Sequence, residues 1–248
     1  MRSKRLLWIR LPWMLLPWIL APLVSTSAHA AEWNASVGMT SDYIVRGRSR
    51  SLNEGAIQGS VSLQGENPWT AGVWASSVKL YEGAPRQAEL DYFLAGELPI
   101  SRDFRLNGQA TYYQFVGGST AFSYDYTELA VSLSFQDTLS ASVTWSPDYG
   151  YYRANYSGGS MVTDTAVSYE LSARHPLNRY VLAFAGVGHA DLGERDREYN
   201  FWSGGAEVSW DRYGVSLTYV DSDSDAQRLF RSLASRNAWI ATLSVRLR

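Results

Sequence analysis

Residues 237–247, Asn-Ala-Trp-Ile-Ala-Thr-Leu-Ser-Val-Arg-Leu, alternate between apolar and polar side chains. A period of two predicts a β-strand, with Trp239, Leu243 and Leu247 on one face and Thr242 and Arg246 on the other. If the apolar face meets lipid and the polar face meets water, the strand belongs to a transmembrane barrel. The alternative is a secreted β-sandwich that packs the apolar face into a core.

The same alternation recurs along the chain and predicts an all-β, single-domain, antiparallel up-and-down barrel of about twelve strands. The expected strands are 33–40, 56–64, 69–80, 87–98, 104–115, 123–136, 138–147, 163–174, 180–189, 199–210, 214–221 and 238–248. In segment 123–136, for example, Leu129, Val131 and Leu133 are expected to face outward and Glu128 and Ser132 inward.

The connections alternate between short and mostly longer ones, as expected for periplasmic turns and extracellular loops. The longer ones are 41–55, 81–86, 116–122, 148–162, 190–198 and 222–237. Many aromatic residues lie near strand ends, where the girdles of a membrane barrel lie, but Trp74 is in mid-strand and is expected to face inward.

The N-terminus has the features of a secretory signal peptide over residues 1–30. Basic residues precede an apolar stretch from Leu11 to Val24, and Ala28-His29-Ala30 is a cleavage sequence, so we expect cleavage between Ala30 and Ala31. The apolar stretch is short for a membrane anchor, which needs about 20 residues. The mature domain would then be 31–248, exported through the signal peptide.

Charge and cysteine content exclude some classes of protein. Removing residues 1–30 takes four of the 22 basic residues and none of the 24 acidic ones, which leaves 18 − 24 = −6. This charge argues against a nucleic-acid partner. The chain has no cysteine, so disulfides cannot stabilise it outside the cell.

Residues 40–51, Thr-Ser-Asp-Tyr-Ile-Val-Arg-Gly-Arg-Ser-Arg-Ser, resemble the opening motif of a bacterial envelope family labelled Gcw_chp, or TorF-type porins. Weaker matches follow in the same order at residues 71–78, 89–93 and 146–149. The motif positions are Thr40, Ser41, Asp42, Tyr43, Arg46, Gly47 and Ser49.

The resemblance implies a barrel in the outer membrane of a Gram-negative bacterium, with outer-membrane lipid and the barrel-assembly machinery as partners. It brings no known substrate and no cofactor. The chain departs from the pattern of many such barrels at its last residue, where Arg248 stands in place of an aromatic residue.

The inward phase of the strands predicts a polar lumen that passes small solutes or ions. The candidate lining residues are Glu89, Asp91, Arg105, Glu128, Glu170, Arg174, Glu207 and Arg246. Their excess of carboxylates predicts a weak preference for cations. The alternative is that these charges pair and plug a narrow, structural barrel, since twelve strands lie between filled eight-strand barrels and open porins.

Two loops carry further charge patterns. Arg46, Arg48 and Arg50 lie in the first outside loop, where they could bind an anionic solute or a lipid phosphate, or pair locally with Asp42 and Glu54. Residues 221–225 resemble the start of a calcium loop but lack its later Gly and Glu, so we expect no metal site.

Enzymatic and adhesive functions are the remaining alternatives. A lipid hydrolase would need a serine and a histidine within hydrogen-bond reach. His175 is in a short turn, and His189 faces outward while Ser203 faces inward, so no catalytic residue is assigned. Long loops with several tyrosines, such as 148–162, would suit an adhesive barrel.

Overall fold

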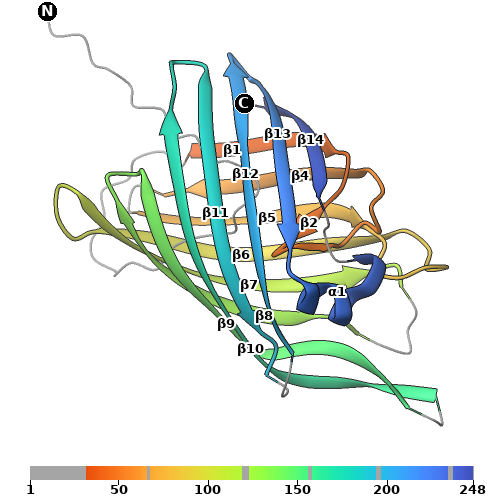
Figure 1. Cartoon of the computed structure of the whole chain (residues 1–248). Coiled ribbons are helices and arrows are strands. Elements are labelled where there is room, and N and C mark those ends of the chain that lie inside the picture. The colour runs from red at the N-terminus through yellow and green to blue at the C-terminus, as the bar shows by residue number, and fades with distance from the viewer. Residues whose placement is uncertain are drawn as a thin grey trace, which may run out of the picture.

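The computed structural model describes residues 32–65, 68–118, 123–155, 158–193, 197–233 and 237–247, and shows a closed antiparallel barrel of twelve strands (Figure 1). The predicted signal peptide 1–30, its cleavage point at Ala30 and Ala31, and Arg248 lie outside the described residues. The barrel strands are β1 (Glu32–Thr40), β4 (Ala56–Gln64), β5 (Trp69–Val78), β6 (Gln87–Pro99), β7 (Phe104–Val116), β8 (Tyr126–Phe135), β9 (Leu139–Asn155), β10 (Gly158–Pro176), β11 (Val181–Asp191), β12 (Glu198–Trp210), β13 (Tyr213–Ser222) and β14 (Ala238–Leu247).

Each strand pairs with its sequence neighbour, and β1 closes the ring by pairing with both β4 and β14. The stretch 237–247 therefore supplies the closing strand, with Val245 opposite Val37 and Leu243 opposite Met39. Closure removes every free sheet edge, which is the condition for a sheet to span lipid.

The predicted faces are confirmed in the barrel wall. On β8 the outward Leu129, Val131 and Leu133 are exposed, whereas Glu128 and Ser132 are buried. Ile57 is 67% exposed and Trp239 62%, although both are large and apolar. A continuous outer surface of this kind is unfavourable in water and suits lipid.

The short turns are also confirmed, and several use residues in the left-handed region, such as Gln136, Asp137 and Asp211. One predicted loop is wrong. Residues 148–155 and 158–162 continue β9 and β10 as a long hairpin past a bulge between Asp164 and Ala166. The Ser-Pro-Asp sequence at 146–148 interrupts the alternation there, because Pro147 cannot donate to the ladder.

Two connections fold across the inside of the outer end of the barrel. Segment 41–55 contains the short hairpin β2 (Ile44–Val45) and β3 (Arg48–Ser49), and segment 223–233 contains α1 (Ser224–Phe230) and the 3-10 turn Arg231–Leu233. Ile44 packs against Val220 of β13 and Ile240 of β14.

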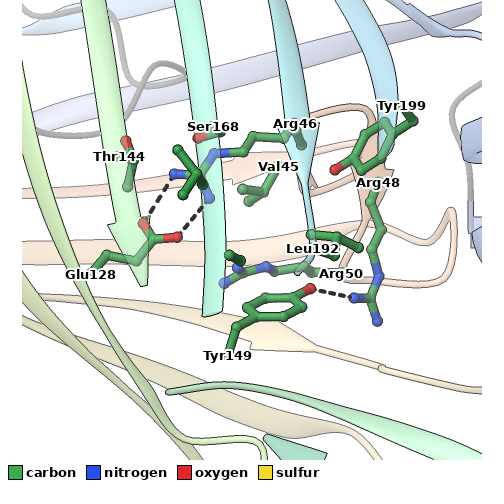
Figure 2. Close-up of a pocket in the computed structure, with 13 residues that line it drawn as sticks. Val45, Arg46, Arg48, Arg50, Glu128, Thr144, Tyr149, Ser168, Leu192 and Tyr199 are labelled. Atoms are coloured by element: carbon green, nitrogen blue, oxygen red, sulfur yellow. Dashed lines mark hydrogen bonds and ion pairs between the residues drawn. The ribbon is translucent and has the colours of Figure 1, made fainter. Parts of the chain in front are cut away.

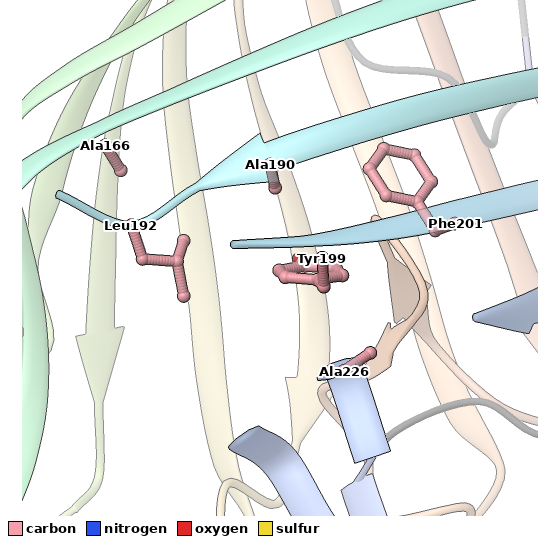
Figure 3. Close-up of a cluster of buried hydrophobic side chains, with 6 residues drawn as sticks. All are labelled: Ala166, Ala190, Leu192, Tyr199, Phe201 and Ala226. Carbon is pink, nitrogen blue, oxygen red and sulfur yellow. The ribbon is translucent and has the colours of Figure 1, made fainter. Parts of the chain in front are cut away.

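Apolar contacts hold both connections in place. Tyr43 packs against Trp74, with ring centroids 5.2 Å apart, which places that mid-strand tryptophan inside the barrel. Figure 3 shows Ala226 of α1 beside Tyr199 and Phe201 of β12 and near Leu192. The inward face therefore has apolar clusters at the outer end, where the loops pack, and buried polar residues beside them.

Among the described residues, no helix is long and apolar enough to cross a membrane.

Candidate functional site

Segment 41–55 is folded by its own polar residues. The Asp42 carboxylate accepts hydrogen bonds from the hydroxyls of Ser49 (2.6 Å) and Ser51 (2.7 Å), and the Ser51 hydroxyl accepts the Tyr43 amide at 2.9 Å. Burial raises the pKa of the Asp42 carboxyl, although these hydrogen bonds partly offset the effect. Gly47 has a φ of 73°, and a Cβ there would lie 2.8 Å from Phe201 Cβ. The loop therefore has one backbone shape that fits the barrel wall.

Arg46 extends from this loop to the opposite wall. Its two terminal nitrogens donate to Glu128 of β8 at 2.6 and 3.0 Å, and its Nε lies 3.4 Å from Glu170 of β10 (Figure 2). The Tyr113 hydroxyl donates a further hydrogen bond of 3.0 Å to Glu128. The forked, buried geometry is the strongest form of an arginine–carboxylate pair.

Arg50 makes a second connection to the wall. It donates to Glu89 of β6 and to the hydroxyl of Tyr126 of β8, and Glu89 also accepts from the Tyr43 hydroxyl at 2.9 Å. The guanidinium carbon lies 5.3 Å from the ring centroid of Tyr113 and 5.7 Å from that of Tyr126. Aromatic faces stabilise a cation in such an arrangement, so Arg50 is held by both charge and rings.

Arg48 differs from the other two arginines, because the described part of the chain gives it no carboxylate partner. Its Nη1 donates to the Tyr149 hydroxyl at 3.2 Å, and its guanidinium carbon lies 5.1 Å from the Phe230 ring centroid. It therefore links the hairpin β2–β3 to both β9 and α1.

A cavity of about 30 Å³ lies among these arginines and is lined also by Glu128, Ser168 and Tyr199 (Figure 2). A cavity of this size has room for a water molecule or a small ion. Segment 41–55 therefore lies inside the barrel with a small, charged cavity beside it.

The family model described as "Bacterial protein of unknown function (Gcw_chp)" matches residues 25–245. The chain belongs to this family. Searching the curated proteins finds no match for it.

Among solved structures, the Gcw_chp chain is similar to a NanC porin, with 9% identity, coverage of 88% of this chain and 100% of that one, and a TM-score of 0.54. The Pseudomonas putida toluene transporter TodX matches at 9% identity, with 89% of each chain covered and a TM-score of 0.45. LpxR from Salmonella typhimurium matches at 8% identity, with 86% of this chain and 99% of that one covered and a TM-score of 0.46. At such identities, the likeness to the NanC porin shows the outer-membrane type of barrel fold and no more.

In the Gcw_chp barrel, the eight predicted lining residues divide into two groups. Glu89, Asp91, Glu128 and Glu170 lie around segment 41–55, and the first three are buried. The other four lie toward the short turns. Arg105 pairs with Glu97 and Asp137, Arg174 donates to the Asp137 carbonyl at 2.6 Å, Arg246 donates to the Asp211 carbonyl at 2.9 Å, and Glu207 accepts from Ser209 at 2.7 Å.

The motif residues Thr40, Ser41, Asp42, Tyr43, Arg46, Gly47 and Ser49 all take part in seating the segment. Thr40 donates to the Asp42 carbonyl at 2.8 Å, and the Ser41 hydroxyl accepts the amide of Ala241 on β14 at 3.0 Å. The motif thus contains the residues that shape the loop and the residues that tie it to the wall.

Local pairing of the arginines with Asp42 and Glu54, one of two alternatives for this loop, is wrong. Asp42 binds serines, and Glu54 pairs with Lys79 and Arg86 instead. The reason is that the segment turns into the barrel, where buried carboxylates of the wall lie closer to the arginines than those of the loop do. The placement as a solvated outside loop is wrong for the same reason.

The acidic run at 221–225 has a capping role. Asp223 accepts the backbone amides of Asp225 and Ala226 and so begins α1, and Asp221 accepts from the Tyr219 hydroxyl. The described residues contain no cluster of three or more His, Cys, Asp or Glu that could hold a metal ion.

The register separates His189 from Ser203. His189 pairs with Asn200 and Ser203 with Gly186, three positions away along the strands. The imidazole of His189 contacts Asn200 at 3.0 Å and Glu198 at 3.6 Å on the outside. This pair does not meet the geometry of a nucleophile and its base.

Two inward tyrosines were missed as members of the site: Tyr113 and Tyr126. The rings of Tyr113 and Tyr126 stack at 4.4 Å, and both are buried. The alternation along the strand could have identified Tyr113 as inward-facing, because it follows the inward residues Gln109 and Thr111 at steps of two.

Proposed function

We propose that this Gcw_chp protein is an outer-membrane channel for small solutes or ions, narrowed in its outer half by segment 41–55. The observation that carries this proposal is the pair of anchors, Arg46 with Glu128 and Arg50 with Glu89, that hold the segment across the lumen. The apolar outer surface supports a position in the membrane. The twelve-strand ring supports a lumen wide enough for a loop and a small passage beside it.

The lining supports only a small charge preference. Around the segment, four carboxylates (Glu89, Asp91, Glu128, Glu170) face three arginines (Arg46, Arg48, Arg50), which gives 3 − 4 = −1. We propose that the weak cation preference comes from this difference, and that Asp91, the one of the four with no ion pair among the described residues, contributes to it when it is ionised. Most of the other carboxylates anchor the segment.

The experiment is conductance of the purified protein in a planar lipid bilayer. The expected result is small unitary steps that grow several-fold when residues 44–50 are deleted, because the deletion removes both anchored arginines and the hairpin. A folded protein with no steps, before and after the deletion, would favour the alternative of a plugged structural barrel.

Selectivity is tested on the same preparation with a salt gradient. Asp91→Asn should move the reversal potential toward that of a non-selective pore, whereas Glu207→Gln, near the short turns, should change it less. Equal reversal potentials in all three proteins would remove Asp91 from the selectivity of the channel.

A further inference from the structure

The cavity beside Arg46 and Arg48 has an unusual set of donors that are not satisfied within the protein. The Nε of Arg48 and the hydroxyl of Ser168 are buried and have no hydrogen-bond partner among the described residues, and the buried Nε of Arg46 faces only the Glu170 carboxylate, at 3.4 Å. All three residues line the same cavity of about 30 Å³ (Figure 2). Buried donors without a partner are costly, so their presence around one cavity points to something that they bind.

The charge around the cavity favours an anion at this point. Arg46 and Arg50 each use their terminal nitrogens on a carboxylate, but Arg48 contacts only the Tyr149 hydroxyl and the Phe230 ring. Its charge therefore has no counter-charge among the described residues. Of the carboxylates nearby, Glu128 lines the cavity and accepts from Arg46 with both oxygens, and Glu170 forms an ion pair with the Arg46 Nε at 3.4 Å.

The walls of the cavity are well fixed. Ser168 is 4% exposed on β10, where it is paired with Thr144 of β9, and Tyr199 and Leu192 close the side toward α1. The anchors of segment 41–55 hold the two guanidinium groups in position. A site assembled in this way loses little entropy when it binds a small ion.

We propose that this cavity is a binding site for a small monovalent anion, held by Arg46, Arg48 and Ser168. The ion is either a halide or the carboxylate end of a small solute, since both offer a compact negative charge to N–H and O–H donors. The volume excludes larger anions unless the segment moves. The anion site requires the folded segment but does not require that the barrel conducts. The proposed anion binding and the proposed channel function can therefore be tested independently.

The test is anion binding to the purified, folded barrel at constant ionic strength, with isethionate as the bulky replacement anion. Bromide and formate are the probes, and the readout is the temperature at which the protein loses its heat-modifiable gel band. Bromide-soaked crystals provide a second readout through the anomalous signal. We expect saturable stabilisation by at least one probe and an anomalous peak between the three donors.

Arg48→Gln should weaken binding about tenfold or more, because it removes the uncompensated charge together with one donor. Ser168→Val should weaken it less. The matched control is Arg86→Gln, which removes an exposed arginine paired with Glu54 outside the cavity and should leave binding unchanged. The heat-modifiable band shows that each variant is folded.

Binding of bromide and formate alike identifies a general anion site, and binding of formate alone identifies a carboxylate site. Either result supports the proposal. If neither probe stabilises the folded protein, or if Arg48→Gln and Arg86→Gln bind equally, the donors hold water and the proposal is wrong. A protein that binds bromide but does not conduct would overturn the channel and leave the anion site intact.

Discussion

Replacement of Glu128 by glutamine tests whether buried ion pairs hold segment 41–55 inside the barrel. Glu128 is 4% exposed and accepts two hydrogen bonds from Arg46 and one from Tyr113. A glutamine can still accept from Tyr113, but it leaves the Arg46 charge with only Glu170, at 3.4 Å.

The size of the effect follows from that geometry. Removing one partner of a buried ion pair typically costs about 3–5 kcal/mol, because the other charge stays buried without compensation. Since Glu170 remains near Arg46, we expect the lower end, about 3 kcal/mol in the free energy of seating the segment. At about 1.4 kcal/mol for each factor of ten, the unseated population should rise roughly 100-fold.

The assay uses the absence of cysteine from the chain. A single Val45→Cys substitution places a thiol at a position that is 8% exposed and lines the cavity. Its alkylation by a large maleimide reports the unseated population when seating is fast relative to the reaction. We expect Glu128→Gln to accelerate alkylation about 100-fold.

Glu207→Gln is the matched control, since Glu207 is a half-buried wall glutamate that accepts from Ser209 and has no arginine partner among the described residues. It should leave the rate unchanged. The double variant Arg46→Gln with Glu128→Gln should react more slowly than Glu128→Gln alone, because the uncompensated charge is gone. Rates within about threefold of one another in all variants would refute the role of the ion pairs.

Three further predictions concern the wall and the second inward connection. Val131→Arg, on the outward face of β8, should destabilise the barrel in lipid by about 2–4 kcal/mol in urea unfolding, whereas Val116→Arg at the outer end of β7 should cost about 0–1; equal costs would argue against a membrane-embedded belt. Asp223→Ala should cost about 1 kcal/mol through loss of the α1 cap. Burial alone raises the pKa of the Asp223 carboxyl, but hydrogen bonds from backbone amides and an asparagine leave it lowered. The ionised cap therefore stabilises α1 above about pH 4, and this stabilisation is lost as the pH falls below that value. Hydrogen exchange at pH 3 and pH 7 should show the loss of α1 protection at low pH in the parent and not in the variant. Gly72→Ala should lower the unfolding free energy by about 1–3 kcal/mol, because its Cβ would lie 2.6 Å from the Val61 carbonyl oxygen, and Gly59→Ala, with 3.4 Å to its nearest neighbour, should cost clearly less.

The wall of the barrel could be predicted because each strand carries its own evidence. Alternation on β8 and β14 assigns every side chain to a face, and the turn at Gln136–Asp137 occurs where the alternation stops. These signals are local, and lipid on one side and a polar interior on the other make a shift of register costly. The one failure, at 148–162, came where Pro147 and a bulge interrupted the alternation.

The interior could not be predicted in the same way, because its contacts join distant segments. Arg46 and Glu128 are 82 residues apart, and Arg50 and Glu89 are 39 apart. In the sequence alone, the arginines are typical of a solvated loop, and the glutamates are typical of the lining of a cation-selective pore. Each reading is locally reasonable, and only the inward turn of segment 41–55 brings the two sets together.

The two charge sets also explain each other physically. Glu89 and Glu128 would be costly to bury on a barrel wall without partners, and an arginine-rich segment would be costly to place inside the barrel without counter-charges. Segment 41–55 supplies two arginines at the positions of these carboxylates, and aromatic rings from β7 and β8 close around Arg50. One arginine is left over, Arg48, together with buried donors that have no partner. Arg46 and Arg50 are therefore accounted for by the seating of the segment, whereas Arg48 is not, and that difference is the reason to look for an anion beside it.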